Sequence, residues 1–150
     1  MSETSERDGP RKLGHVHLKV RDIERAVAFY TDVLRLAVEE RHGRYAFLTY
    51  GDHHHDVALQ AVRPDTPEQT AGVGLYHAAF EVEDADALEA TYRRLAGRGV
   101  DVSPVDHGIS KALYFDDPSG NGLEVYLDTR ERNDRETWRG KNDPFDPVAL

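Results

Sequence analysis

The chain has 150 residues, of which 39% are hydrophobic, and its 28 acidic and 19 basic side chains give a formal net charge of −9 at pH 7. This length and composition are typical of one globular domain, and the acidic balance without a basic run argues against a nucleic-acid partner, because phosphate binding needs clustered positive charge. No apolar window of about 18 residues could span a membrane, and no apolar core of a secretion signal is present, so we expect a cytoplasmic protein.

The first part of the chain predicts a βαβββ unit. Residues 1–12 are polar, and we expect them to form a disordered leader. From His15 polar and apolar residues alternate, as in a half-buried strand. Asp22 then provides an N-cap for a helix whose apolar stripe runs from Ile23 to Leu34. Three short strand-like runs follow, at residues 37–40, 45–50 and 56–62.

The same pattern begins again after a Pro- and Gly-containing linker, residues 63–74. A second strand starts at Tyr76, and Asp84 caps a second helix, which is expected to end near Gly97. An offset of 62 residues superimposes the two halves. It pairs His15 with His77, Asp22 with Asp84, and Tyr30 with Tyr92. We therefore predict a tandem duplication, with the two units lining one cup.

The duplication points to a metal site. The chain has no Cys, so a metal must be held by His and carboxylate groups. His15 and His77 occupy equivalent positions, and a cup with pseudo-twofold symmetry would bring them together. Glu124 lies in an otherwise apolar strand, where a buried carboxylate needs a cation or hydrogen-bond donors. Two His and one carboxylate form the facial triad that favours Fe(II) or Mn(II) and leaves positions open for substrate and O2.

The chain resembles a known family in three segments: residues 13–22, 28–34 and 116–126. They are similar to the vicinal oxygen chelate (glyoxalase/bleomycin resistance/extradiol dioxygenase) superfamily and, within it, to single-domain type I extradiol catechol 2,3-dioxygenases. The resemblance covers residues 13–128 and leaves a C-terminal tail, residues 129–150. It implies an α+β fold in which two tandem βαβββ modules, residues 13–62 and 75–128, form an incomplete barrel around a metal site.

The resemblance also implies roles for individual residues. His15, His77 and Glu124 match the iron ligands. The run from His54 resembles a His-His segment whose second member is the acid/base, which implies His55, although the residues alone leave His53, His54 and His55 open.

A second match lies nearer the C-terminus of the body. Residues 106–110 resemble a segment whose His hydrogen-bonds the bound catechol oxygen, which implies His107. Tyr114, four residues before Pro118, matches a Tyr close to the metal site. Strand alternation places His17 on the face of His15 and Tyr126 on the face of Glu124, so both are candidates for the substrate pocket.

These residues together predict an Fe(II)-dependent enzyme, with Mn(II) as the alternative ion. It would cleave catechol or a substituted catechol beside the diol with O2, giving a 2-hydroxymuconic semialdehyde. We expect a homodimer or a higher homo-oligomer. Trp138 and Phe145 predict that the tail docks on the body or on a neighbouring subunit, because large aromatic side chains seldom remain in solvent.

Two alternatives share the predicted fold, because fold alone does not fix function. One is a metal-dependent lyase or isomerase of the glyoxalase or epimerase type, and the other is a small-molecule binding protein of the bleomycin-resistance kind. An offset of 66 residues places Ala58 opposite Glu124. Glyoxalase I proteins of the superfamily have a carboxylate ligand in both halves, so Ala58 favours three protein ligands and the dioxygenase.

Overall fold

The fold consists of two βαβββ modules followed by a short tail. The structure is a computed structural model that describes residues 8–69 and 71–149, so residues 1–7 of the predicted leader and residue 70 of the predicted linker lie outside the described residues. The first module contains β1 (Val16–Val20), α1 (Ile23–Asp32), β2 (Ala37–His42), β3 (Tyr45–Thr49) and β4 (Val57–Ala61). The second contains β5 (Ala78–Val82), α2 (Ala85–Gly97), β6 (Ser103–Asp106), β7 (Ser110–Asp116) and β8 (Gly122–Asp128). The tail adds α3 (Arg130–Asn133), β9 (Asp143–Pro144) and a 3-10 turn, Pro147–Ala149.

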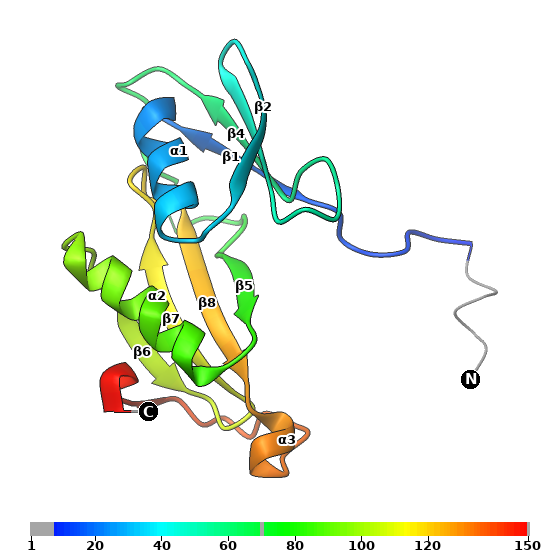
Figure 1. Ribbon diagram of the computed structural model, residues 1–150, viewed down its shortest axis with the longest axis vertical. Helices are drawn as coiled ribbons and strands as arrows, with labels where there is room; N and C mark the ends of the chain where they lie inside the picture. Colours follow the sequence, from blue (N-terminus) through cyan, green and yellow to red (C-terminus); the bar gives the residue numbers. More distant parts are fainter. Residues whose placement is uncertain (1–7, 70, 150) are drawn as a thin grey trace.

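Each module builds one mixed sheet. The strand order is β1-β4-β3-β2 in the first sheet and β5-β8-β7-β6-β9 in the second. In both, the first strand pairs in parallel with the last strand of its module, while the remaining pairs are antiparallel. Figure 1 shows the two modules stacked along the long axis, and neither sheet closes into a barrel. The predicted α+β fold with an incomplete barrel is confirmed.

The two helices begin where the sequence pattern predicts. The Asp22 carboxylate accepts a hydrogen bond from the Arg25 N–H at 3.1 Å, and the Asp84 carboxylate accepts one from the Ala87 N–H at 2.8 Å. Each bond satisfies an N–H that has no partner within its own helix. The predicted apolar stripe of α1 reaches Leu34, whereas the helix itself ends at Asp32 with Val33 as its C-cap, because Arg35 adopts a positive φ of 63°.

One hydrophobic core joins the modules. The buried Tyr30 hydroxyl of α1 donates to Asp117 Oδ2 at 2.8 Å, in the turn between β7 and β8. The same turn reaches the end of β1, where the Arg21 N–H donates to Ser119 Oγ at 2.9 Å and Asn121 Nδ2 donates to the Lys19 carbonyl at 2.9 Å. The modules are therefore fixed to each other on the side of the core.

The face of each sheet that points away from the core carries several of the predicted site residues. In β1 the residues Leu18 and Val20 point into the core, and His17 is exposed on the other face. In β8 the core takes Leu123, Val125 and Leu127. Glu124 and Tyr126 alternate with them and so share the opposite face, as predicted.

The tail returns to the second sheet. β9 pairs antiparallel with β6, and Phe145 packs against the core with the Lys111 ammonium 5.5 Å from its ring centroid. Trp138 stays about half exposed. Among the described residues, no helix combines the length and the apolar character that crossing a bilayer requires.

Candidate metal centre

The second sheet gathers a carboxylate, an imidazole and a phenol on its open face. Glu124 on β8 lies directly opposite Tyr114 on β7 in the antiparallel ladder. His77, which immediately precedes β5, places Nε2 3.0 Å from Glu124 Oε1, and its ring centroid is 5.5 Å from that of Tyr114. Gly122 permits this approach, because a side chain there would collide with the Tyr76 carbonyl.

His77 and Glu124 have the donor chemistry and spacing of two ligands of one divalent cation. Two ligand atoms at right angles, each about 2.1 Å from an ion, are about 3.0 Å apart, which matches the Nε2 to Oε1 distance. The other ring nitrogen, His77 Nδ1, is buried and has no hydrogen-bond partner. Glu124 is only 9% exposed. A buried carboxylate of this kind is stabilised by a cation.

Tyr114 keeps its proton at neutral pH. Its burial and the neighbouring Glu124 carboxylate raise the pKa of Tyr114 to about 12. Its hydroxyl lies 2.8 Å from His107 Nε2, so the predicted residues His107 and Tyr114 are joined by a hydrogen bond. The second module therefore brings together four of the predicted site residues.

The first sheet gathers a separate group of imidazoles. The ring centroids of His15 and His55 are 4.3 Å apart, and the His55 ring lies 5.0 Å from Phe47. Burial, followed by the charges of His15 and His54, lowers the pKa of His55, which favours the neutral ring.

The three consecutive His residues have different carboxylate and aromatic partners, although His54 Nδ1 also lies 3.0 Å from His55 Nδ1. His53 Nε2 is 3.4 Å from Asp56 Oδ1, and His54 Nε2 is 2.9 Å from Glu40 Oε1. His55 is the member of the run whose ring lies against His15, tilted by 54° to it. His55 lies in the irregular turn between β3 and β4, so the alternation of side chains along β4, which begins at Val57, does not fix the direction of its ring.

The two candidates for the substrate pocket lie on the open faces of different sheets. His17 Nε2 is 3.0 Å from Gln60 Oε1, and its ring meets Tyr45 edge to face, with centroids 6.2 Å apart. Tyr126 pairs across the strands with Glu81. His42, the last residue of β2, is exposed.

The predicted metal ligands are not assembled within one chain. Over residues 8–69 and 71–149, no group of three or more His, Asp or Glu side chains could hold one ion. His77 and Glu124 are adjacent, and His15 belongs to the imidazole group of the other module. His15 and His77 nevertheless line the same open cavity, of about 480 Å³.

The strand register decides which residue is the counterpart of Glu124. Ala58 pairs with His17 on β1, and Glu124 pairs with Ala79 on β5. His17 and Ala79 are related by the offset of 62 residues that superimposes the two modules. Their strand partners are therefore equivalent too, and Ala58 occupies in the first module the position that Glu124 has in the second. That module therefore places no carboxylate at this strand position.

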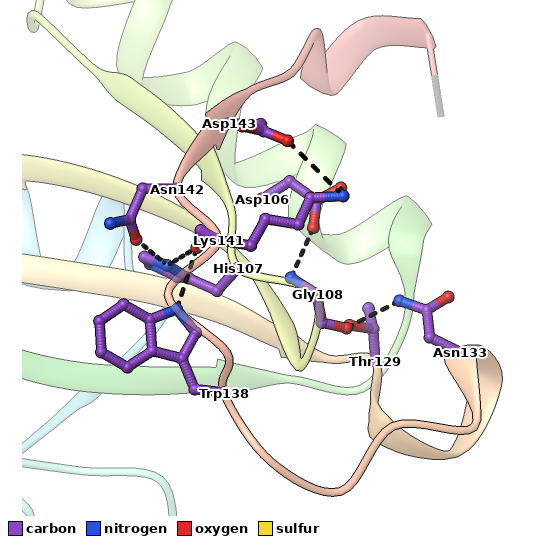
Figure 2. A network of polar contacts seen from close by, with 9 residues as sticks. All are labelled: Asp106, His107, Gly108, Thr129, Asn133, Trp138, Lys141, Asn142 and Asp143. Atoms are coloured by element: carbon purple, nitrogen blue, oxygen red, sulfur yellow. Dashed lines mark hydrogen bonds and ion pairs between the residues drawn. The ribbon is translucent and has the colours of Figure 1, made fainter.

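Sequence reasoning missed a set of contacts from the tail. Trp138, Lys141 and Asn142 gather around His107, as Figure 2 shows. The sequence holds no signal for them, because the tail has neither the strand nor the helix periodicity that places a side chain on a face.

Comparisons with known proteins agree with this architecture. The family model described as the glyoxalase/bleomycin resistance protein/dioxygenase superfamily matches residues 12–125. A catechol-2,3-dioxygenase of Bacillus subtilis (strain 168) is 34% identical over 130 residues, which are 85% of this chain and 44% of that protein. This chain thus spans less than half the length of that relative.

Two further matches extend over a larger share of the related protein. A biphenyl-2,3-diol 1,2-dioxygenase of Rhodococcus globerulus is 32% identical over 132 residues, which are 84% of this chain and 67% of that protein. The crystal structure of the fosfomycin resistance protein FosX of Mesorhizobium loti superimposes with a TM-score of 0.64 at 25% identity and covers 83% of this chain and 98% of that one.

Proposed function

Because the chain belongs to the glyoxalase/bleomycin resistance protein/dioxygenase superfamily, we propose that it is a metal-dependent extradiol dioxygenase acting on catechol or a substituted catechol. The main support is the contact of His77 with Glu124 beside the protonated Tyr114. The likeness to two dioxygenases at 32% and 34% identity supports the reaction class.

The proposed ligands are His15, His77 and Glu124, and the proposed ion is Fe(II), with Mn(II) as the alternative. An ion held by these residues would supply electron transfer between the catecholic substrate and O2. Ring opening beside the diol would then give a 2-hydroxymuconic semialdehyde.

The chain's own residues prepare the substrate. His55 is mainly neutral because its pKa is lowered, so its ring can accept a proton from a catechol hydroxyl and return it later. The Tyr114 hydroxyl stays protonated and lies 2.8 Å from His107 Nε2, so these two residues are proposed to act on the substrate as a pair. Phe47, which contacts His55, provides an apolar wall for an aromatic ring. His17 and Tyr126 are proposed to shape the pocket for ring substituents.

A second copy of the chain is proposed to complete the site. His15 is not grouped with His77 and Glu124, while the helix side of both modules is fixed in the shared core. The open face of the first sheet, with its partly exposed Tyr45 and Phe47, is free to cover the open face of a partner's second sheet.

Mixing two inactive variants tests this arrangement. His15→Ala and Glu124→Gln are purified separately, mixed, and allowed to exchange subunits. In a shared site, the mixed dimer regains one complete set of ligands and shows up to half of the activity of a wild-type dimer. In a site built within one chain, every site lacks a ligand and no activity returns. Mixing His77→Ala with Glu124→Gln is the control, because both changes fall in the same half of the site.

The function itself is tested by oxygen consumption. The protein is loaded with Fe(II) without oxygen, and catechol and O2 are then added while O2 uptake and the yellow absorbance of the product are followed. Stoichiometric uptake with yellowing supports the proposal. Metal-loaded protein that gives neither signal with catechol and a panel of substituted catechols would overturn it.

A second candidate is metal-dependent chemistry without O2, in which the ion acts as a Lewis acid. It is favoured by the match over 98% of a fosfomycin resistance protein, compared with 44% of the catechol dioxygenase. Metal-dependent loss of fosfomycin, with no O2 uptake on catechols, would select this candidate.

A further inference from the structure

The turn that presents His107 is built against the chain that follows β8. Gly108 adopts a positive φ of 82°, and its carbonyl accepts hydrogen bonds from Thr129 Oγ1 and from Asn133 Nδ2, both at 2.8 Å. The Gly108 N–H donates to Asp106 Oδ1 at 2.8 Å. The backbone position of His107 therefore depends on residues outside the β-strand ladder, as Figure 2 shows.

The tail also determines where the hydrogen of the His107 ring lies. Nδ1 is 2.8 Å from Asn142 Oδ1 and 3.2 Å from the Lys141 carbonyl oxygen. A backbone carbonyl can only accept a hydrogen bond, so the neutral ring carries its hydrogen on Nδ1. Nε2, which lies 2.8 Å from the Tyr114 hydroxyl, is then the acceptor.

Trp138 holds the accepting carbonyl in place. Its indole Nε1–H donates to the same Lys141 oxygen at 3.0 Å, and its ring stands nearly perpendicular to that of His107, at 86° with centroids 6.3 Å apart. The Lys141 ammonium lies 3.7 Å from Asp106 and 3.8 Å from Asp143, which pair with each other across β6 and β9. The Lys141 carbonyl is thus held by Trp138, while the Lys141 side chain is held by two carboxylates.

We propose that the segment from Trp138 to Asn142 belongs to the active site, where it fixes the tautomer of His107 so that Nε2 faces Tyr114 as a hydrogen-bond acceptor. The kinetic consequence of this inference rests on the proposed function, because Tyr114 lies beside the proposed ligand Glu124. Asn142 and Trp138 are positioning residues. In this arrangement the neutral His107 ring accepts a hydrogen bond from the Tyr114 hydroxyl at Nε2. The family resemblance instead implies a His that hydrogen-bonds the substrate oxygen.

This arrangement gives the ring a defined proton movement. When a substrate hydroxyl gives its proton to the Tyr114 oxygen, Tyr114 passes its own proton to Nε2. The substrate O–H bond breaks, Tyr114 stays protonated, an N–H bond forms on His107, and the negative charge stays on the substrate oxygen. The resulting imidazolium keeps its Nδ1–H on the Lys141 carbonyl, which stabilises the positive ring. The opposite tautomer would present an N–H to Tyr114 and could not accept this proton.

The tautomer is measured directly in full-length protein labelled with ¹⁵N-histidine, without metal or substrate. Two-bond ¹H–¹⁵N correlations distinguish the two neutral tautomers, and His107→Gln assigns the signal. We expect Nδ1–H in the wild type, a shift toward Nε2–H in Asn142→Leu and in Trp138→Phe, and the wild-type pattern in Asn142→Asp. Glu136→Gln, an exposed change in the same tail, is the matched control.

Kinetics then separate positioning from binding. In Asn142→Leu we expect kcat to fall about tenfold with KM nearly unchanged, because supporting residues of a site have effects of this order, and Asn142→Asp should restore the rate.

Three results distinguish the outcomes. An Nε2–H tautomer in the wild type, or an unchanged tautomer in the variant that carries both Asn142→Leu and Trp138→Phe, overturns the inference. A shifted tautomer with unchanged kcat overturns its kinetic part. A shifted tautomer in a protein that consumes no O2 even as wild type supports the positioning by the tail and overturns only the proposed dioxygenase function.

Discussion

Ala58 and Glu124 occupy equivalent positions in the two modules, each paired with the second residue of its module's first strand. The duplicated unit has thus kept an acidic group in one copy and has only a methyl group in the other. If the site is assembled from both modules, the missing carboxylate leaves a coordination position for an exogenous molecule.

The first prediction restores that carboxylate. We expect Ala58→Glu to keep bound metal but to lower dioxygenase activity by about tenfold or more, because a fourth protein ligand occupies a position that O2 or catechol needs. Ala58→Gln is the matched control for size, since Ala58 is only 1% exposed. Metal content and O2 uptake are measured together. Equal activity of the Glu and Gln variants would contradict the assignment of Ala58.

The second prediction concerns the ligands. His15→Ala, His77→Ala and Glu124→Ala should each weaken Fe(II) binding by at least about tenfold, because each removes a donor from a three-ligand site. Isothermal titration without oxygen measures the affinity. His42→Ala is the control, because His42 is exposed at the end of β2. Full iron occupancy in all three ligand variants would refute the metal centre.

The third prediction separates His55 from its neighbours. His55→Ala should bind metal normally and lose rate by about a hundredfold, the range of general acid–base catalysis. His53→Ala and His54→Ala should keep most of the activity, because their Nε2 atoms lie against Asp56 and Glu40 and only His55 lies against His15. Single-turnover rates with loaded protein measure the effect. A larger loss in His54→Ala than in His55→Ala would reassign the role.

The fourth prediction concerns stability. Tyr30→Phe removes the hydrogen bond to the buried Asp117 carboxylate and should lower the free energy of unfolding by about 1.5–3 kcal/mol. Burial, followed by the Asp117 charge, raises the pKa of Tyr30 well above its usual value. The folded protein therefore holds this proton more tightly, and the stability is lost as pH rises above about 10, where the unfolded chain ionises.

Urea titrations at neutral and alkaline pH measure both effects. The alkaline loss of stability should be smaller in Tyr30→Phe than in the wild type. Tyr92→Phe is the control, because Tyr92 is the equivalent residue of the second module and is partly buried. An equal alkaline loss in the Tyr30 variant and the wild type would contradict the role of Tyr30.

The sequence predicted the modular fold because duplication and capping are local signals. Asp22 and Asp84 cap their helices with their own carboxylates, and the offset that aligns His15 with His77 reflects the repeated strand register. The separation of His15 from Glu124 was not predictable, because the packing of one module on the other depends on long-range contacts. The bond between Tyr30 and Asp117, for example, joins residues that no periodicity relates.

The tail was predictable only in outline. Its aromatic residues indicated docking, and Phe145 does pack on the core. The contact of Asn142 with His107 depends on the path of an irregular segment, and irregular segments have no repeating relation between sequence position and direction.

The segment around Asn142 lies beyond residue 125, where the match to the family model ends. Its side chains are largely exposed, so substitutions there disturb little packing. Evolution or protein engineering can therefore change the surroundings of His107 from this segment while leaving the hydrophobic core and the proposed ligands untouched.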